Sequence, residues 1–122
     1  MRNLLISALL LGLWNCSSPA QNKLDGRAFK IENFTGGKSE GVETMTFKAG
    51  KVENDVCTQW GFGSSDYSCD ADGKFRYTLT SEKEGRMDWE GQVTGNTVSG
   101  KMVWVKAGQD DIHYTFKGEE VK

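Results

Sequence analysis

Hydrophobic and polar residues alternate in short segments along most of the chain. Residues 75–80, for example, read F-R-Y-T-L-T, with an aromatic or aliphatic side chain at every second position. A period of two is typical of strands that bury one face, and no helical period follows residue 24. The pattern predicts eight strands, at about 27–34, 42–48, 51–56, 67–69, 75–82, 86–94, 97–105 and 111–118.

Glycine-containing turns separate these segments. The last four turns lie at Asp72-Gly73, Glu84-Gly85, Gly95-Asn96 and Ala107-Gly108-Gln109. Their spacing of roughly 10 to 13 residues is typical of an antiparallel meander. The single proline, Pro19, precedes all of them and interrupts no strand.

The turn at 95–96 predicts the register of the hairpin around it. A two-residue loop there pairs Trp89 with Met102 and Gly91 with Gly100, so that one face of the hairpin is apolar. A shift by one residue would mix the two faces, and we therefore expect this register.

The same apolar face continues into the last strand. A three-residue loop at 107–109 pairs Phe116 with Gly100. A sheet with one apolar face and no helix to cover it must close on itself or gain a second layer. The sequence therefore predicts an all-β, antiparallel up-and-down meander of about eight short strands, closing as a small lipocalin-like barrel or rolled sandwich.

The N-terminus has the layout of a secretory signal, because M-R-N precedes an apolar run at 4–14 that is too short to span a membrane. The segment L-W-N-C resembles a bacterial lipobox. It predicts a lipoprotein signal peptide at 1–15, a lipidated Cys16, a polar tether at 16–23 and one domain at 24–122. We expect a membrane-anchored protein of the cell envelope, on the outer membrane or facing the periplasm. Cleavage after Ala20 is the alternative, and it would give a soluble secreted or periplasmic protein.

Two cysteines, Cys57 and Cys69, remain in the domain, and we expect export to join them in a disulfide. Between them the chain carries W-G-F-G, with Trp60 and Phe62. One interpretation is that both rings close an end of the barrel. The other is that they are displayed to a protein, glycan or lipid partner.

The remaining candidate binding residues lie on the inward face, and they are Trp89, Gly91, Gly100 and Trp104. Two glycines that face each other leave a notch, which could hold a small apolar ligand. The alternative is that the ring of Phe116 folds over the notch and the glycines allow the strands to coil.

Charge and residue types argue against several other functions. The net charge is -2 without a basic stripe, which argues against nucleic-acid binding. The single histidine, His113, is expected on the outer face, where it cannot serve a nucleophile or complete a zinc site with two cysteines. We expect no catalytic residues, no metal, no cofactor and a monomer.

Two family resemblances bear on function. The stretch E-G-R-M-D-W-E-G-Q-V-T-G-N-T-V-S-G-K-M-V-W-V-K-A-G-Q, with L-D-G-R-A-F and C-T-Q-W-G-F-G, resembles a group of small, uncharacterised exported bacterial proteins. This likeness implies a β-barrel-type domain and no known activity. V-S-G-K-M-V-W-V-K-A-G-Q-D-D is also similar to the S-G-x-x-Y-x-W-W-x-K-G region of membrane-bound lysozyme inhibitors, although Met102 and Val105 replace two aromatic residues.

These observations predict a non-enzymatic envelope lipoprotein that binds a partner protein or a small apolar ligand. The alternative function is inhibition of an exported hydrolase such as lysozyme.

Overall fold

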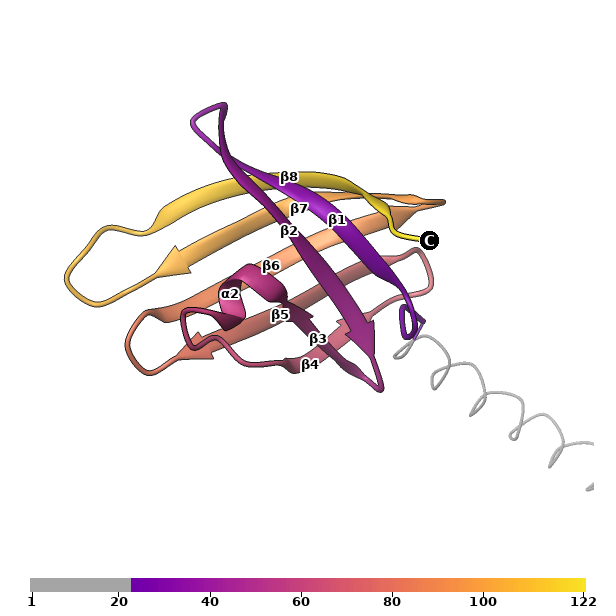
Figure 1. Ribbon diagram of the computed structural model, residues 1–122, viewed down its shortest axis with the longest axis horizontal. Coiled ribbons are helices and arrows are strands. Elements are labelled where there is room, and N and C mark those ends of the chain that lie inside the picture. The colour runs from indigo at the N-terminus through magenta and orange to yellow at the C-terminus, as the bar shows by residue number, and fades with distance from the viewer. Residues whose placement is uncertain (1–22) are drawn as a thin grey trace, which may run out of the picture.

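Eight antiparallel strands follow one another around a closed barrel in the computed structural model, which describes residues 23–122 (Figure 1). The strands are β1 (Ala28–Thr35), β2 (Lys38–Lys48), β3 (Lys51–Asn54), β4 (Ser65–Cys69), β5 (Lys74–Ser81), β6 (Gly85–Thr94), β7 (Thr97–Val105) and β8 (Ile112–Glu120). Each strand pairs with the next, and β1 pairs with β8. The predicted all-β meander is confirmed, and it closes as a barrel. The signal peptide, Cys16 and all but the last residue of the tether lie outside the described residues.

The strands differ from the prediction at two places. β2 begins at Lys38, four residues earlier than expected, because Gly36 and Gly37 form a tight loop with positive φ at both positions. The third strand ends at Asn54, and the chain then forms one helical turn, α2 (Asp55–Thr58). This turn directs the buried Cys57 toward the barrel interior, so the chain leaves the sheet where a strand was expected.

The predicted registers are confirmed. β6 pairs with β7 through Trp89 and Met102 and through Gly91 and Gly100. β7 pairs with β8 through Gly100 and Phe116. The alternation of apolar and polar residues was sufficient to predict this part of the barrel because its two loops are short.

The interior is filled mainly by aromatic rings. Phe47 packs edge-on against four of them, with centroid distances of 4.8 Å to Tyr67 and 5.4 Å to Phe75. Trp89 is stacked on Tyr77 at 5.7 Å. Such pairs stabilise a core by about 0.5–1.5 kcal/mol beyond the burial of their area.

Three glycines on the inward face allow the strands to approach one another closely. A Cβ atom at Gly100 would overlap the carbonyl oxygen of Glu90 and lie 2.8 Å from Cζ of Phe116. A Cβ atom at Gly118 would overlap the backbone of β1, which crosses it. The notch between Gly91 and Gly100 is thus occupied by neighbouring rings, as the alternative interpretation predicted.

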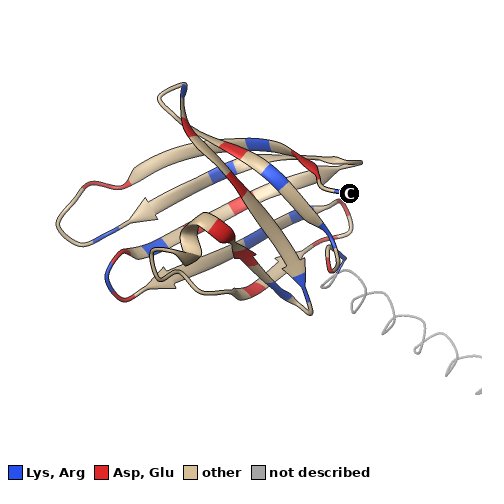
Figure 2. Ribbon diagram, in the orientation of Figure 1, with Lys and Arg blue, Asp and Glu red and all other residues tan. Residues whose placement is uncertain are grey.

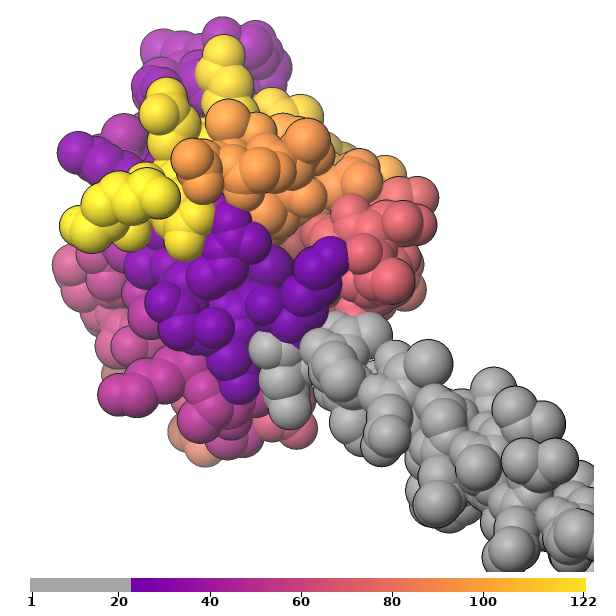
Figure 3. Space-filling model, turned by 90° about the vertical axis from the view of Figure 1, so that its right-hand side faces the viewer, coloured from indigo at the N-terminus to yellow at the C-terminus, as the bar shows by residue number. Residues whose placement is uncertain are grey.

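The two ends of the barrel differ. At the end that carries the β2–β3, β4–β5 and β6–β7 turns, Leu24 is fully buried. The carboxylate of Asp25 accepts hydrogen bonds from the hydroxyl of Tyr67 (2.7 Å) and the backbone N–H of Gly50 (3.0 Å). We call this the closed end; Figure 3 faces it and shows the start of the described chain, the C-terminus and these turns together.

The opposite end carries the β1–β2, β5–β6 and β7–β8 turns together with α2, and we call it the open end (Figure 1). The connection from β3 to β4, which contains α2, runs across it. β3 and β4 themselves share only two residue pairs, fewer than any other neighbouring strands. This short pairing makes a seam in the wall beneath α2.

Gly100→Ala is expected to lower the free energy of unfolding by at least about 2 kcal/mol, because the new methyl group has no room between two strands and a ring. Chemical denaturation monitored by circular dichroism measures this change. Gly63→Ala is the matched control, since its Cβ meets nothing within 4 Å, and we expect a change within about 0.5 kcal/mol. Equal effects of the two substitutions would contradict the close approach.

Candidate functional site

A cavity of about 420 Å³ opens at the open end of the barrel. Its walls come from β1, β2, the β5–β6 turn, β6, β7, β8 and the segment that contains α2. This volume lies within the range of small-molecule binding sites in proteins. We call it the mouth cavity.

One side of the mouth cavity is apolar. The alternation of β6, β7 and β8 points Met87, Met102, Trp104 and Tyr114 inward, and they lie in adjacent pairs. The indole N–H of Trp104 donates to the carbonyl oxygen of Glu84 at 2.6 Å, which fixes the ring at the rim. Methionine side chains are unbranched and adapt to ligands of different shape. This wall is suited to an apolar group.

The two aromatic residues between the cysteines have different environments. Phe62 is 1% exposed and closes part of the open end, whereas Trp60 is 61% exposed at the rim. Hydrogen bonds from the N–H of Phe62 to the carbonyl oxygen of Cys57 and from the hydroxyl of Ser81 to the carbonyl oxygen of Trp60 hold the segment in place. Phe62 thus closes part of the barrel end as the first interpretation expected, whereas Trp60 does not, and display of Trp60 to a partner stays a prediction.

A carboxylate lies in the deeper part of the cavity. Glu43 on β2 is 7% exposed, and its Oε2 accepts a hydrogen bond from Nδ2 of Asn33 at 2.5 Å. The thiol of Cys57 lies 3.5 Å from its Oε1. Among residues 23–122, no lysine or arginine forms an ion pair with Glu43. Burial raises the pKa of this carboxyl group, and the hydrogen bond from Asn33 opposes the shift.

Other polar atoms near Glu43 lack partners. Oδ1 of Asn33 is buried and accepts no hydrogen bond. Asn54 accepts a hydrogen bond from the hydroxyl of Tyr77 at 2.8 Å. Its amide lies near enough to lower the pKa of Glu43, but Nδ2 makes no hydrogen bond of good geometry. The polar atoms that Asn33 and Glu43 present to the cavity are thus mainly acceptors.

Glu43 and Asn33 were not among the residues expected at the site. The sequence did contain a sign that Glu43 points inward, because a period of two places it on the same face of the strand as Met45 and Phe47. A charged residue on a predicted inward face is informative, since carboxylates are rarely buried without a partner.

The cysteines are two free, buried thiols in place of the expected disulfide. Sγ of Cys57 lies 3.6 Å from Sδ of Met87, whereas Cys69 pairs with Phe75, which pairs with Gly91. Met87 and Gly91 are four residues apart on β6, or about 13 Å. A disulfide requires Cα atoms within about 7 Å, so the two thiols lie at different levels of the barrel. Burial is the main cause that raises the pKa of both thiols.

Of the residues expected to bind a ligand, Trp60, Phe62 and Trp104 line the mouth cavity. Trp89 does not, because it lies in the packed core with 1% exposure. Gly91 and Gly100 are paired with each other next to Trp89, and on the inner side of the sheet they are covered by the rings of Phe75 and Phe116.

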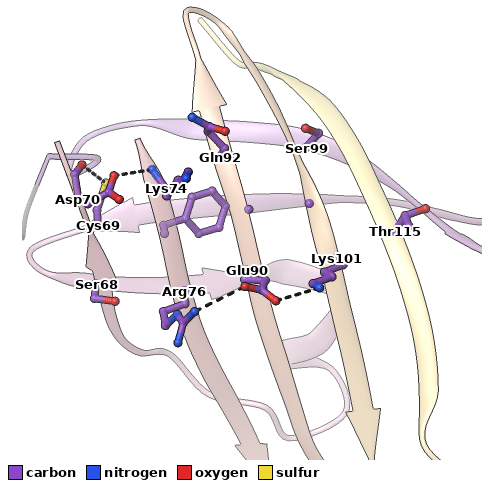
Figure 4. A pocket seen from close by; sticks show the side chains of 13 residues that line it. Ser68, Cys69, Asp70, Lys74, Arg76, Glu90, Gln92, Ser99, Lys101 and Thr115 are labelled. Atoms are coloured by element: carbon purple, nitrogen blue, oxygen red, sulfur yellow. Dashed lines mark hydrogen bonds and ion pairs between the residues drawn. The ribbon is translucent and has the colours of Figure 1, made fainter. Parts of the chain in front are cut away.

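A larger hollow of about 750 Å³ lies on the outer face of β4–β8, over the two glycines (Figure 4). Three of its charged side chains form one network, in which Glu90 pairs with Arg76 at 3.6 Å and with Lys101 at 3.4 Å. These side chains are exposed, and the hollow is more open to solvent than the mouth cavity. In the view of Figure 2, neither sign of charge gathers on one face. The mouth cavity is the better candidate for a binding site.

The side chains that a metal site would need are dispersed in the described part of the chain. His113 is exposed on β8, paired with Val103. Among residues 23–122, no three histidine, cysteine or carboxylate side chains are grouped as a metal site requires. No helix of this part is long and apolar enough to cross a membrane. Comparison with protein-family models, curated proteins and solved structures finds no match.

We expect both thiols to resist iodoacetamide in the folded protein at pH 8 and to react after denaturation, because burial keeps them protonated. Peptide mapping by mass spectrometry measures the extent of alkylation at Cys57 and at Cys69 separately. Thermal melts with and without reductant should coincide. A melting temperature that falls by several degrees in reductant would instead reveal a disulfide, which stabilises by roughly 3 kcal/mol.

Glu43→Gln is expected to stabilise the protein, by an amount that grows with pH. A carboxyl group whose pKa is raised on folding contributes stability below its unfolded pKa of about 4.3 and loses it as pH rises through the folded pKa. The amide does not ionise, so the variants should be similar at pH 4 and diverge toward pH 8. Asp55, Cys57 and Tyr77 face Glu43 in both proteins.

Denaturation curves at pH 4, 6 and 8 measure this difference in the free energy of unfolding. Glu53→Gln is the control, because Glu53 is exposed on β3 and should change little at any pH. A Glu43→Gln protein that is less stable than the wild type at pH 8 would show that the carboxylate is compensated.

Proposed function

We propose that this protein is a non-enzymatic, exported binding protein that holds a small, largely apolar ligand in the mouth cavity. The observation that carries the proposal is the cavity itself. An apolar wall of Met87, Met102 and Trp104 faces a few polar atoms at its base. This combination of a broad apolar surface with a few placed polar groups is typical of ligand sites in barrels.

The position of the termini supports attachment at the N-terminus. The described chain begins at Lys23, whose ammonium contacts the β4–β5 turn at the closed end. The cavity opens at the other end. A lipid at Cys16 would therefore hold the protein with its mouth directed away from the membrane. The likeness to small exported bacterial proteins agrees with this arrangement.

A second function, inhibition of an exported hydrolase such as lysozyme, is favoured by one observation. Trp60 and Val56 are both exposed at the rim of the open end. Exposed tryptophan is a frequent energetic centre of protein interfaces. The likeness of the 98–111 stretch to membrane-bound lysozyme inhibitors points the same way.

The neutral apolar fluorophore N-phenyl-1-naphthylamine is expected to bind the full chain with a micromolar dissociation constant and with enhanced emission. Met87→Trp should weaken binding at least ten-fold, because the larger side chain fills the cavity. Thr115→Trp is the matched control, since it places the same ring in the outer hollow, and its affinity should be unchanged.

Loss of binding in Thr115→Trp alone would move the site to the outer hollow. Absence of binding to the wild-type chain would overturn the proposal. Inhibition of lysozyme at near-stoichiometric protein, lost in Trp60→Ala at unchanged stability, would establish the second function in its place.

A further inference from the structure

The polar side chains of Glu43 and Asn33 at the base of the mouth cavity present unpaired hydrogen-bond acceptors. Oε2 of Glu43 accepts one hydrogen bond, from Asn33, and Oε1 receives only a weak contact from the thiol of Cys57 at 3.5 Å. Oδ1 of Asn33 accepts none. A carboxylate has about four acceptor sites and an amide oxygen has two, so several remain open. Nδ2 of Asn54 is an unpaired donor close to Glu43, but Asn54 does not line the cavity, so a ligand that contacts Glu43 and Oδ1 of Asn33 must itself supply hydrogen-bond donors.

The charge at the cavity has one sign. Three of its lining residues are glutamates, Glu40, Glu43 and Glu84, and none is lysine, arginine or histidine. Lys106 lies nearby, but its ammonium pairs with Glu84 at 2.9 Å and so leaves the other two unneutralised by any described side chain. In its ionised form Glu43 therefore places a negative charge without a counter-charge beneath an apolar wall.

A buried charge without a counter-charge destabilises the fold. Glu43 is at the same time held in place, by the hydrogen bond from Asn33. A cationic ligand would provide the missing charge and the missing donors together. The aromatic rings of Trp60 and Tyr114 at the opening also favour a cation that rests against them, whereas the ring of Trp104 already has the ammonium of Lys106 5.9 Å from its centroid.

We propose that the ligand of the mouth cavity is an amphipathic amine, whose primary or secondary ammonium group binds Glu43 and Oδ1 of Asn33 while its apolar part packs on Met87, Met102 and Trp104. The proposal rests on the proposed function, because it names the ligand class of the same cavity. A quaternary ammonium fits less well, since it has no N–H to donate to the amide oxygen.

Octylamine, octanol and octanoate test this proposal because they share one apolar tail. At pH 7 we expect octylamine to bind the full chain at least ten-fold more tightly than octanol, and octanoate to bind most weakly. Isothermal titration calorimetry measures the three affinities, and displacement of N-phenyl-1-naphthylamine from the cavity checks the location.

Glu43→Gln should abolish the preference for the amine and leave the affinity for octanol within about two-fold. Glu53→Gln, on the outer side of β3, should retain the preference. Met87→Lys is an independent variant, because it introduces an ammonium beside Cys57 and Glu43, and it should also reduce the ratio of amine to alcohol affinity toward one. A general loss of cavity volume would weaken the binding of octylamine and octanol alike, and so it would leave the ratio of their affinities unchanged.

Three results would overturn the proposal while leaving the proposed function intact. They are equal affinities for amine and alcohol, a preference that persists in Glu43→Gln, and tighter binding of octanoate. Tighter binding of octanoate would show that Glu43 acts in its protonated, donating form. Failure of the fluorophore and of all three ligands to bind would instead overturn the proposed function.

Discussion

The close approach of strands at Gly91, Gly100 and Gly118 is the constraint on which the rest of this barrel depends. These residues lie on neighbouring strands, and a side chain larger than hydrogen would collide with backbone at each of them. Their absence of side chains allows the sheet to coil tightly enough for β8 to meet β1. The rings of Phe75 and Phe116 then occupy the space above the glycines. The glycines thus contribute both to closure of the sheet and to the packing of its interior.

This packing also determines where the cavity lies. The level of Trp89 and the closed end are filled by large rings and by Leu24, and the enclosed space that remains is at the open end. There the polar side chains of Asn33 and Glu43 share the lining with rings and methionines. The tightly packed core and the proposed binding site therefore lie at different levels along the barrel axis. A buried carboxylate disfavours folding, and sites of this kind commonly exchange stability for function.

Sequence reasoning predicted the fold well because the information was local. Short loops and a strict period of two fixed the pairing of Trp89 with Met102 and of Gly100 with Phe116. It predicted less of the site, because the site depends on which residues meet across strands that are distant in sequence. The expected disulfide shows the same limit. Export to an oxidising compartment and the presence of two cysteines in the domain suggested that Cys57 and Cys69 pair, yet α2 places Cys57 near Met87 and away from Cys69. The position of α2 follows from tertiary packing, which periodicity does not encode.

The seam between β3 and β4 is the place where the barrel wall has the fewest paired residues. Only two residue pairs join these strands, whereas β6 and β7 share nine. Segments with few backbone hydrogen bonds open at a lower free energy than the elements around them. The α2 segment, with Phe62 beneath it and Trp60 outside, spans this seam. This part of the wall is therefore expected to open locally before the rest of the barrel, and the exposed indole of Trp60 would report such opening by fluorescence.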